Sequence, residues 1–386
     1  MVLVVFEDVL DRDLSGSARA PHWNSLVLAG RYYGRAQTMP LSSQSRACIE
    51  FGRYGRNLVP PIREVMSPFI GPEPAAGETT LALQLKSAGY SCGLFGKWDL
   101  GRNPLNLSGQ YLGAPLARGY DTWRAGVPAN LTAYTNWLRV DDAMPSTEPG
   151  YATIVQVAEA SAWWNATVYP KFMHLAISAA RQPFHNPPAD LTAGGNLGST
   201  DPRVQYELMI RSVDWVLGQI AALSGIATTT LVCVCSDGGT PSAVPGPGQN
   251  PNRLNGTAYL DGARVPVLWY GPTLVTRGRD PRLAHLVDVP ATFLTAAGVA
   301  VPVDWDGVNM LTHFSVPIRT HAVIEAQLGS GSLERGVVRD DGWKLIRHPT
   351  GSDELYDTFN DPLESSPRNL NDPNLAAILA DLRSYL

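Results

Sequence analysis

The chain has 386 residues, which is enough for one large α/β domain and a small second unit. Its formal net charge is −5, so the sequence offers no strongly basic surface for binding nucleic acid. No apolar run reaches the roughly 20 residues that a membrane-spanning helix needs. The composition therefore predicts a globular protein with neither a nucleic-acid partner nor a membrane span.

The first predicted strand, over 2–6, is a continuous apolar run that ends in Glu7-Asp8. The run has no basic residues before it and no small-residue cleavage site after it, so it does not resemble a secretory signal. Two interpretations follow: the protein stays in the cytosol, or the chain begins after a leader that has been removed.

Strand and helix patterns alternate along most of the chain, which predicts a mostly parallel sheet with helices on both faces. A helix over about 80–88, capped by Thr79 or Thr80, is followed by a strand over 91–95. The clearest helix has its apolar residues at helical spacing over 205–223. The other elements predicted for this part are strands over 172–178, 229–235 and 265–270 and a helix over 288–297.

The pattern changes at about Arg319. Three short strands are predicted over 322–325, 336–339 and 343–347, and Asp341-Gly342 predicts a tight turn between the last two. A final helix is predicted over 375–385. We therefore divide the chain into an α/β domain of residues 1–318 and a small subdomain of residues 319–386 with a four-stranded type of sheet.

Four cysteines and four glycosylation sequons occur in the chain. The cysteines lack the spacing of a zinc site, and we interpret them as buried small hydrophobic residues. They are Cys48, Cys92, Cys233 and Cys235. The Asn-x-Ser/Thr sequons favour a secretory history. They begin at Asn106, Asn130, Asn165 and Asn255.

Acidic residues follow two of the predicted strands, Glu7-Asp8 after the first and Asp237 after the strand over 229–235. Ligands gather at the carboxyl ends of strands in open parallel sheets, and Ca²⁺ and Mg²⁺ prefer oxygen ligands. These carboxylates are therefore candidates for a divalent-cation site. The alternative is that each one caps a helix or forms a turn, which is the commoner role of such residues.

A resemblance to a known family arises from the order of short motifs along the chain. The run Ser42-Ser43-Gln44-Ser45-Arg46, followed by Gly52-Arg53, resembles the sulfatase signature Cys-x-Pro-Ser-Arg with Thr-Gly-Arg after it. Glu7-Asp8 precedes this run, and Gly96-Lys97-Trp98 and Ser236-Asp237-Gly238 follow it. This layout is similar to that of the sulfatase branch of the alkaline phosphatase superfamily.

The resemblance extends through almost the whole chain, because the segments 21–30, 80–101, 261–266 and 342–362 are also similar to family segments. It implies an α/β fold with a large mixed, mostly parallel sheet sandwiched by helices. It also implies a small C-terminal antiparallel α+β subdomain.

The family binds one divalent cation, so the resemblance implies a Ca²⁺ or Mg²⁺ site. Glu7 and Asp8 fall where the family has two metal-binding aspartates, and Asp237 matches a third acidic ligand. Glu7 keeps the charge but adds a methylene group, so the ion would have to shift. The next ligand is normally Asn or His, and Gly238 offers no side chain in its place. The resemblance therefore implies an ion that is held weakly or lost.

The catalytic residues implied by the resemblance are Ser42, Arg46, Lys97 and Arg181. Ser42 takes the place of the residue that active sulfatases oxidise to formylglycine, their nucleophile. Some sulfatases start from serine, but Gln44 replaces the Pro or Ala that modifying enzymes read, which argues against formylglycine here. Arg46 would hold the nucleophile, and Lys97 would contact a sulfate or phosphate oxygen.

Three positions that should bind the substrate depart from the family pattern. Asp99 replaces a histidine and would repel a sulfate. Arg181 replaces another histidine, and it can bind an anion but is a poor proton donor near neutral pH. Asn255 replaces a second lysine, and a glycan on it would block the pocket. His185 either replaces a lost histidine or is a loop residue near the mouth of the pocket.

Two functions are consistent with these residues. The first is a pseudoenzyme, a sulfatase homologue with little or no activity whose role is to bind a sulfated glycan, a sulfated small molecule or another protein. The second is an active, metal-dependent hydrolase of sulfate or phosphate esters that uses Ser42, as formylglycine or as a plain alkoxide. Family resemblance and the sequons favour a secreted or lumenal protein.

Overall fold

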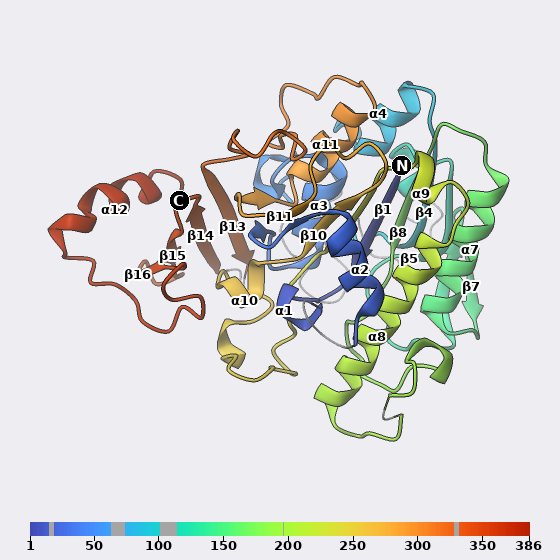
Figure 1. Ribbon diagram of the computed structural model, residues 1–386, viewed down its shortest axis with the longest axis horizontal. Coiled ribbons are helices and arrows are strands. Elements are labelled where there is room, and N and C mark those ends of the chain that lie inside the picture. The colour runs from blue at the N-terminus through green and yellow to red at the C-terminus, as the bar shows by residue number, and fades with distance from the viewer. Residues whose placement is uncertain (15–18, 63–73, 101–113, 196, 328–331) are drawn as a thin grey trace.

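The computed structural model describes residues 1–14, 19–62, 74–100, 114–195, 197–327 and 332–386 (Figure 1). Its largest sheet has ten strands in these residues, in the order β11-β2-β10-β9-β1-β8-β4-β5-β6-β7. In that order, their bounds are Gly278–Asp280, Arg31–Tyr33, Val267–Tyr270, Val232–Ser236, Val2–Phe6, Lys171–Ala176, Ser91–Lys97, Thr122–Val127, Trp137–Asp141 and Met144–Glu148.

The centre of this sheet is parallel and its flanks are mixed. β1 pairs in parallel with β8 and β9, and β4 pairs in parallel with β8 and β5. β10 is antiparallel to both of its neighbours, and β6 and β7 extend the other flank in antiparallel order. All five residues of β1 are fully buried, as expected for a strand covered on both faces. The predicted fold class is thereby confirmed.

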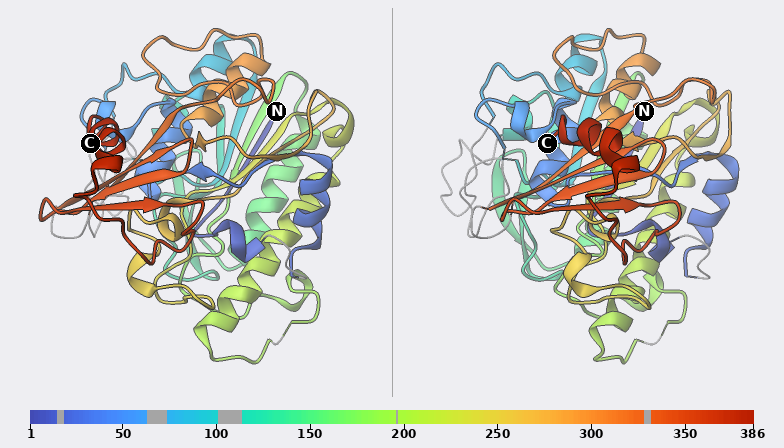
Figure 2. Two further views of the ribbon diagram at one scale, coloured as in Figure 1. Left: turned by 60° about the vertical axis from the view of Figure 1, so that its left-hand side comes forward. Right: turned by 90° about the vertical axis from the view of Figure 1, so that its left-hand side faces the viewer.

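Helices cover both faces of the large sheet (Figures 1 and 2). One group packs together as α2 (Pro21–Ala29), α7 (Ala152–Ala166) and α8 (Pro202–Ala221). The other group packs together as α3 (Ser42–Phe51), α4 (Leu81–Ser87) and α11 (Asp288–Ala296). The shorter helices are α1 (Asp11–Leu14), α6 (Ala114–Ala117), α9 (Ile226–Thr229) and α10 (Leu260–Ala263). None of the described helices is long and apolar enough to cross a bilayer.

The C-terminal part of the chain forms a four-stranded antiparallel sheet that lies beside the main body (Figure 1). Its strands are β13 (His321–Gln327), β14 (Leu333–Arg339), β15 (Trp343–Arg347) and β16 (Asp353–Asp357). One face packs on the segment 258–263 of the main body, and α12 (Ala376–Arg383) covers the other. The short strands β3 (Ala36–Gln37) and β12 (Ala284–His285) pair in parallel as a separate two-stranded sheet.

Most elements predicted in chain order are present with shifted ends. Thr80 caps α4 as predicted, because its hydroxyl accepts a hydrogen bond from the Leu83 amide. The strand predicted over 229–235 begins only at Val232, because residues 226–229 form α9. The predictions omitted α7 and the strands β5 to β7. All four cysteines are buried free thiols.

Candidate functional site

The predicted site residues lie together at the carboxyl ends of the central parallel strands of the large sheet. Glu7 and Asp8 follow β1, Asp237 follows β9, and Lys97 is the last residue of β4. These four side chains, together with those of Arg46, Asp99, Arg181, Ser42 and Asn255, are called the carboxylate cluster below. All of them except Arg181 and Asn255 belong to buried residues, so their charges must be balanced within the protein.

Lys97 is held entirely by oxygen atoms of the protein. Its ammonium group contacts Glu7 Oε1, Asn130 Oδ1 at 2.7 Å and Asp99 Oδ2 at 3.2 Å. An ammonium has three N–H donors, so these three acceptors account for all of them. The side chain of Lys97 has no exposed surface. In this arrangement Lys97 has no donor left for a sulfate oxygen.

Arg46 is placed by the second turn of α3 and points at the end of β9. Its Nη2 donates to Asp237 Oδ2 at 2.9 Å and lies 3.8 Å from Glu7 Oε1, while Nη1 donates to the Lys97 carbonyl. Although burial opposes it, the charges of Asp237 and Glu7 raise the pKa of Arg46 above its usual range. Arg46 therefore stays a cation and is bound to the two carboxylates.

Ser42 is the first residue of α3 and lies beside Arg181. Arg181 Nη1 is 3.3 Å from Ser42 Oγ and 3.2 Å from Asp8 Oδ2. The charge of Asp8 raises the pKa of Arg181 above its usual range, so this guanidinium does not act as a proton donor at neutral pH. Arg181 keeps 23% of its side chain exposed, whereas Lys97 and Arg46 keep almost none.

Asn255 fills the space beside Gly238. Its Nδ2 donates to Asp8 Oδ1 at 2.7 Å, and a Cβ atom built on Gly238 would lie only 2.5 Å from that nitrogen. The missing side chain at position 238 and the side chain of Asn255 are therefore complementary in shape. Restoring a ligand at position 238 would require Asn255 to move away from Asp8.

His185 is held outside the carboxylate cluster by two tyrosines and a carbonyl. Its Nδ1 donates to the Pro183 carbonyl at 2.8 Å, so Nε2 accepts the hydrogen bond from the Tyr151 hydroxyl at 2.9 Å. Its ring also packs against Tyr134, with 4.4 Å between the centroids. Burial lowers the pKa of His185. Both ring nitrogens of this neutral histidine are thus used away from Ser42.

The three carboxylates do not fit a divalent cation in this arrangement. Five of their six oxygens accept hydrogen bonds or ion pairs from the protein, and the sixth, Glu7 Oε2, is buried without a partner in the described residues. Burial raises the pKa of Glu7 to about 7, although Lys97 opposes this. Within the described ranges, no group of three or more His, Cys, Asp or Glu side chains is arranged to hold a metal ion.

The predicted glycosylation residues lie in different surroundings. Asn165 is exposed in the last turn of α7. Asn130 is exposed, but its side-chain oxygen accepts a hydrogen bond from Lys97. Asn255 is half-buried in the carboxylate cluster. Asn106 lies outside the described residues.

Two tyrosines that were not predicted as site residues form hydrogen bonds with the backbone of the site. The Tyr206 hydroxyl on α8 donates to the carbonyl of Asp8 at 2.9 Å, and Asp8 itself has a left-handed backbone with φ of 57°. The Tyr134 hydroxyl contacts the carbonyls of Ser178 and Arg181. Tyr206 was visible in the sequence only as an apolar position of a helix, and no sequence pattern singled out Tyr134.

Comparison with known proteins identifies the family. The sequence model described as Sulfatase matches residues 1–299, which is more than half of the chain. The chain belongs to the sulfatase family. Members of this family usually bind a divalent metal and carry formylglycine.

Curated sulfatases match most of this chain. Human N-acetylgalactosamine-6-sulfatase is 29% identical over 314 residues, which cover 70% of this chain and 56% of that protein. Human arylsulfatase A is 26% identical over 351 residues, covering 80% of this chain and 66% of that protein. The chain thus spans little more than half the length of the first of these relatives. The names of these relatives describe sulfatases, which agrees with the family match.

Solved structures share the fold over all of this chain and more than nine-tenths of their own. Ps i-CgsB in complex with k-i-k-neocarrahexaose superposes with a TM-score of 0.86 at 21% identity, covering 100% of this chain and 91% of that one. BT4656 in complex with its substrate D-glucosamine-2-N,6-O-disulfate gives a TM-score of 0.79 at 17% identity, covering 100% of this chain and 96% of that one. At these identities the likeness shows the fold of the sulfatase family and no more.

Proposed function

We propose that this sulfatase-family protein is a pseudoenzyme that has lost efficient hydrolysis of sulfate esters and acts by binding. The observation that carries the proposal is that the three cations to which the resemblance gives a catalytic role are bound to carboxylates of the same site. Lys97 contacts Glu7 and Asp99, Arg46 contacts Asp237, and Arg181 contacts Asp8.

The charge of the carboxylate cluster also argues against attracting a sulfate. Its four carboxylates are Glu7, Asp8, Asp99 and Asp237, and its three cations are Arg46, Lys97 and Arg181. The formal sum is negative, and it is zero when Glu7 is protonated. A sulfate ester is an anion, so this cluster gives it no net electrostatic attraction.

A glycan is the partner that the family relationship favours. Ps i-CgsB binds an oligosaccharide and BT4656 a sulfated sugar. Arg181 is the one cation of the carboxylate cluster with a substantial exposed part, so it would contact the glycan at the mouth of the site. We also propose a secreted or lumenal location, with glycosylation at the exposed Asn165.

Hydrolysis of an aryl sulfate and an aryl phosphate by the protein and by Ser42→Ala, each with added Ca²⁺ or Mg²⁺, tests the main proposal. We expect the same background rate of ester hydrolysis for the two proteins. Removal of one transition-state donor or acid commonly costs about 10²-fold or more in rate, and several such groups are replaced or bound to carboxylates in this protein. Turnover by the unsubstituted protein that Ser42→Ala abolishes would refute the pseudoenzyme proposal.

A second candidate is an active hydrolase that uses Ser42. The position of Ser42 Oγ, 3.3 Å from Arg181 Nη1 at the start of α3, favours it, because the guanidinium would stabilise an anionic nucleophile. Mass spectrometry of the peptide containing Ser42, from protein made in its natural source, tests the formylglycine version. A mass lower by two hydrogens would support this candidate, and an unmodified serine would leave only the alkoxide version.

A further inference from the structure

We propose that Lys97 and Arg46 take the electrostatic place of a divalent cation, so that the carboxylate cluster is stable without metal. The inference concerns what stabilises this part of the fold, and it goes beyond the proposed loss of hydrolysis. The acidic residues that follow β1 and β9 are buried. Each of them would destabilise the folded state strongly if its charge were unpaired.

The protein's own donors surround these carboxylates. Lys97 contacts Glu7, Arg46 contacts Asp237, and Arg181 and Asn255 contact the two oxygens of Asp8. A cation that took oxygens from all three acidic residues would have to break several of these contacts. It would also leave Lys97 and Arg46, which are almost fully buried, next to a second positive charge.

Glu7 forms ion pairs with both Lys97 and Arg46. Glu7 Oε1 lies between the Lys97 ammonium and Arg46 Nη2, so one carboxylate oxygen serves both cations. Lys97 is also bound by Asp99, which carries a negative charge at the position where the family has a histidine. Two residues that depart from the family pattern, Glu7 and Asp99, therefore supply two of the three contacts of Lys97.

Thermal unfolding of the whole chain, stripped with EDTA and then supplied with a millimolar excess of CaCl₂ or MgCl₂, tests this inference. We expect the Tm of the unsubstituted protein to change by less than about 1 °C, since only a ligand that binds the folded state raises it. A rise of about 2 °C or more, or calcium retained in metal analysis of the purified protein, would overturn the inference.

Lys97→Gln supplies the second arm, because it removes the charge but keeps much of the length of the side chain. It leaves Glu7 Oε1 and Asp99 Oδ2 without the ammonium, beside Glu7 Oε2, which already lacks a partner in the described residues. Carboxylate oxygens are the ligands that Ca²⁺ prefers. We expect this variant to unfold at a lower temperature and to gain at least about 2 °C in Tm when CaCl₂ is added. A folded variant that does not respond to calcium would contradict the proposed role of Lys97.

Lys86→Gln is the matched control, because Lys86 forms an exposed ion pair with Asp121 on the surface. It should leave Tm and its response to calcium unchanged. If Lys97→Gln does not fold, the EDTA and calcium arms on the unsubstituted protein still decide the question.

The two proposals fail separately in these experiments. A protein that binds calcium but hydrolyses nothing would overturn this inference and leave the pseudoenzyme proposal intact. A protein that hydrolyses esters without any response to metal would refute the pseudoenzyme proposal and leave this inference intact.

Discussion

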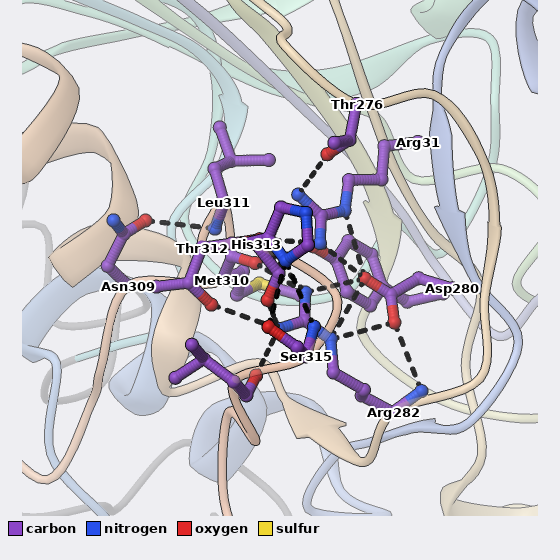
Figure 3. A network of polar contacts seen from close by, with 12 residues as sticks. Arg31, Thr276, Asp280, Arg282, Asn309, Met310, Leu311, Thr312, His313 and Ser315 are labelled. Atoms are coloured by element: carbon purple, nitrogen blue, oxygen red, sulfur yellow. Dashed lines mark hydrogen bonds and ion pairs between the residues drawn. The ribbon is translucent and has the colours of Figure 1, made fainter.

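Asp280→Asn is expected to lower the free energy of unfolding by about 3–5 kcal/mol, because it leaves the buried Arg31 and the partly buried Arg282 without their shared carboxylate. Asp280 ends β11, and its side chain has no exposed surface. Arg31 Nε donates to Asp280 Oδ2 at 2.9 Å, and Arg282 donates to both carboxylate oxygens (Figure 3). Although burial opposes it, these hydrogen bonds hold the pKa of Asp280 below its usual value.

The same network ties the edge of the large sheet to the segment 309–316 (Figure 3). Arg31 Nη2 donates to the Thr312 carbonyl at 2.7 Å, and Arg282 Nη1 donates to the His313 carbonyl at 2.9 Å. Loss of the carboxylate would therefore loosen this segment as well as the arginines. The shift of the urea midpoint measures the effect.

Asp341→Asn is the matched control for Asp280→Asn. Asp341 also accepts hydrogen bonds from an arginine, Arg339, but about half of its side chain is exposed to solvent. An exposed ion pair contributes at most about 1 kcal/mol, so the control should unfold close to the unsubstituted protein. Equal midpoint shifts for the two substitutions would show that burial does not set the strength of the Asp280 network.

Arg46→Met is expected to destabilise the protein by about 3–5 kcal/mol, because it leaves Asp237 buried without its cation. Both side chains are almost completely buried, and their ion pair is 2.9 Å long. Methionine replaces most of the lost volume, so the expected loss is electrostatic more than steric. Urea unfolding measures it, and a loss below about 1 kcal/mol would mean that Arg46 is not the main partner of Asp237.

A double substitution separates charge from packing at this pair. Arg46→Met with Asp237→Asn removes both charges, so it should recover part of the stability lost in Arg46→Met alone. If the double variant is less stable than the single one by the full cost of Asp237→Asn, the two residues act independently. Arg124→Met, in an exposed pair with Asp142, is the surface control and should have little effect.

Much of the fold was predictable because the residues that specify it are local. The apolar run over 2–6 has the composition of a buried strand. Thr80 has a hydroxyl that can cap a helix, and it caps α4, which begins at the next residue. α7 was missed because apolar and polar residues are spread around it without a clear apolar face. β7 was missed because most of its residues are exposed and it includes Pro145, as edge strands often do.

The location of the site residues was predictable, but their partners were not. Glu7 and Lys97 were placed at the carboxyl ends of two parallel strands, β1 and β4, which are separated in the sheet by β8. That placement does not say whether the ammonium binds a substrate or the carboxylate beside it. The choice depends on Asn130 and Asp99, whose positions come from loops after β5 and β4. Loop geometry of this kind depends on tertiary packing and not on local spacing.

A crystal structure of the protein grown with calcium chloride and a sulfated monosaccharide tests the central claim most directly. Data collected at a wavelength where calcium scatters anomalously would locate any bound ion. The account predicts that the Lys97 ammonium contacts Glu7 and Asp99, that Arg46 contacts Asp237, and that no calcium lies among these carboxylates. A calcium ion bound by Glu7, Asp8 and Asp237, with Lys97 turned toward the sulfate, would contradict it.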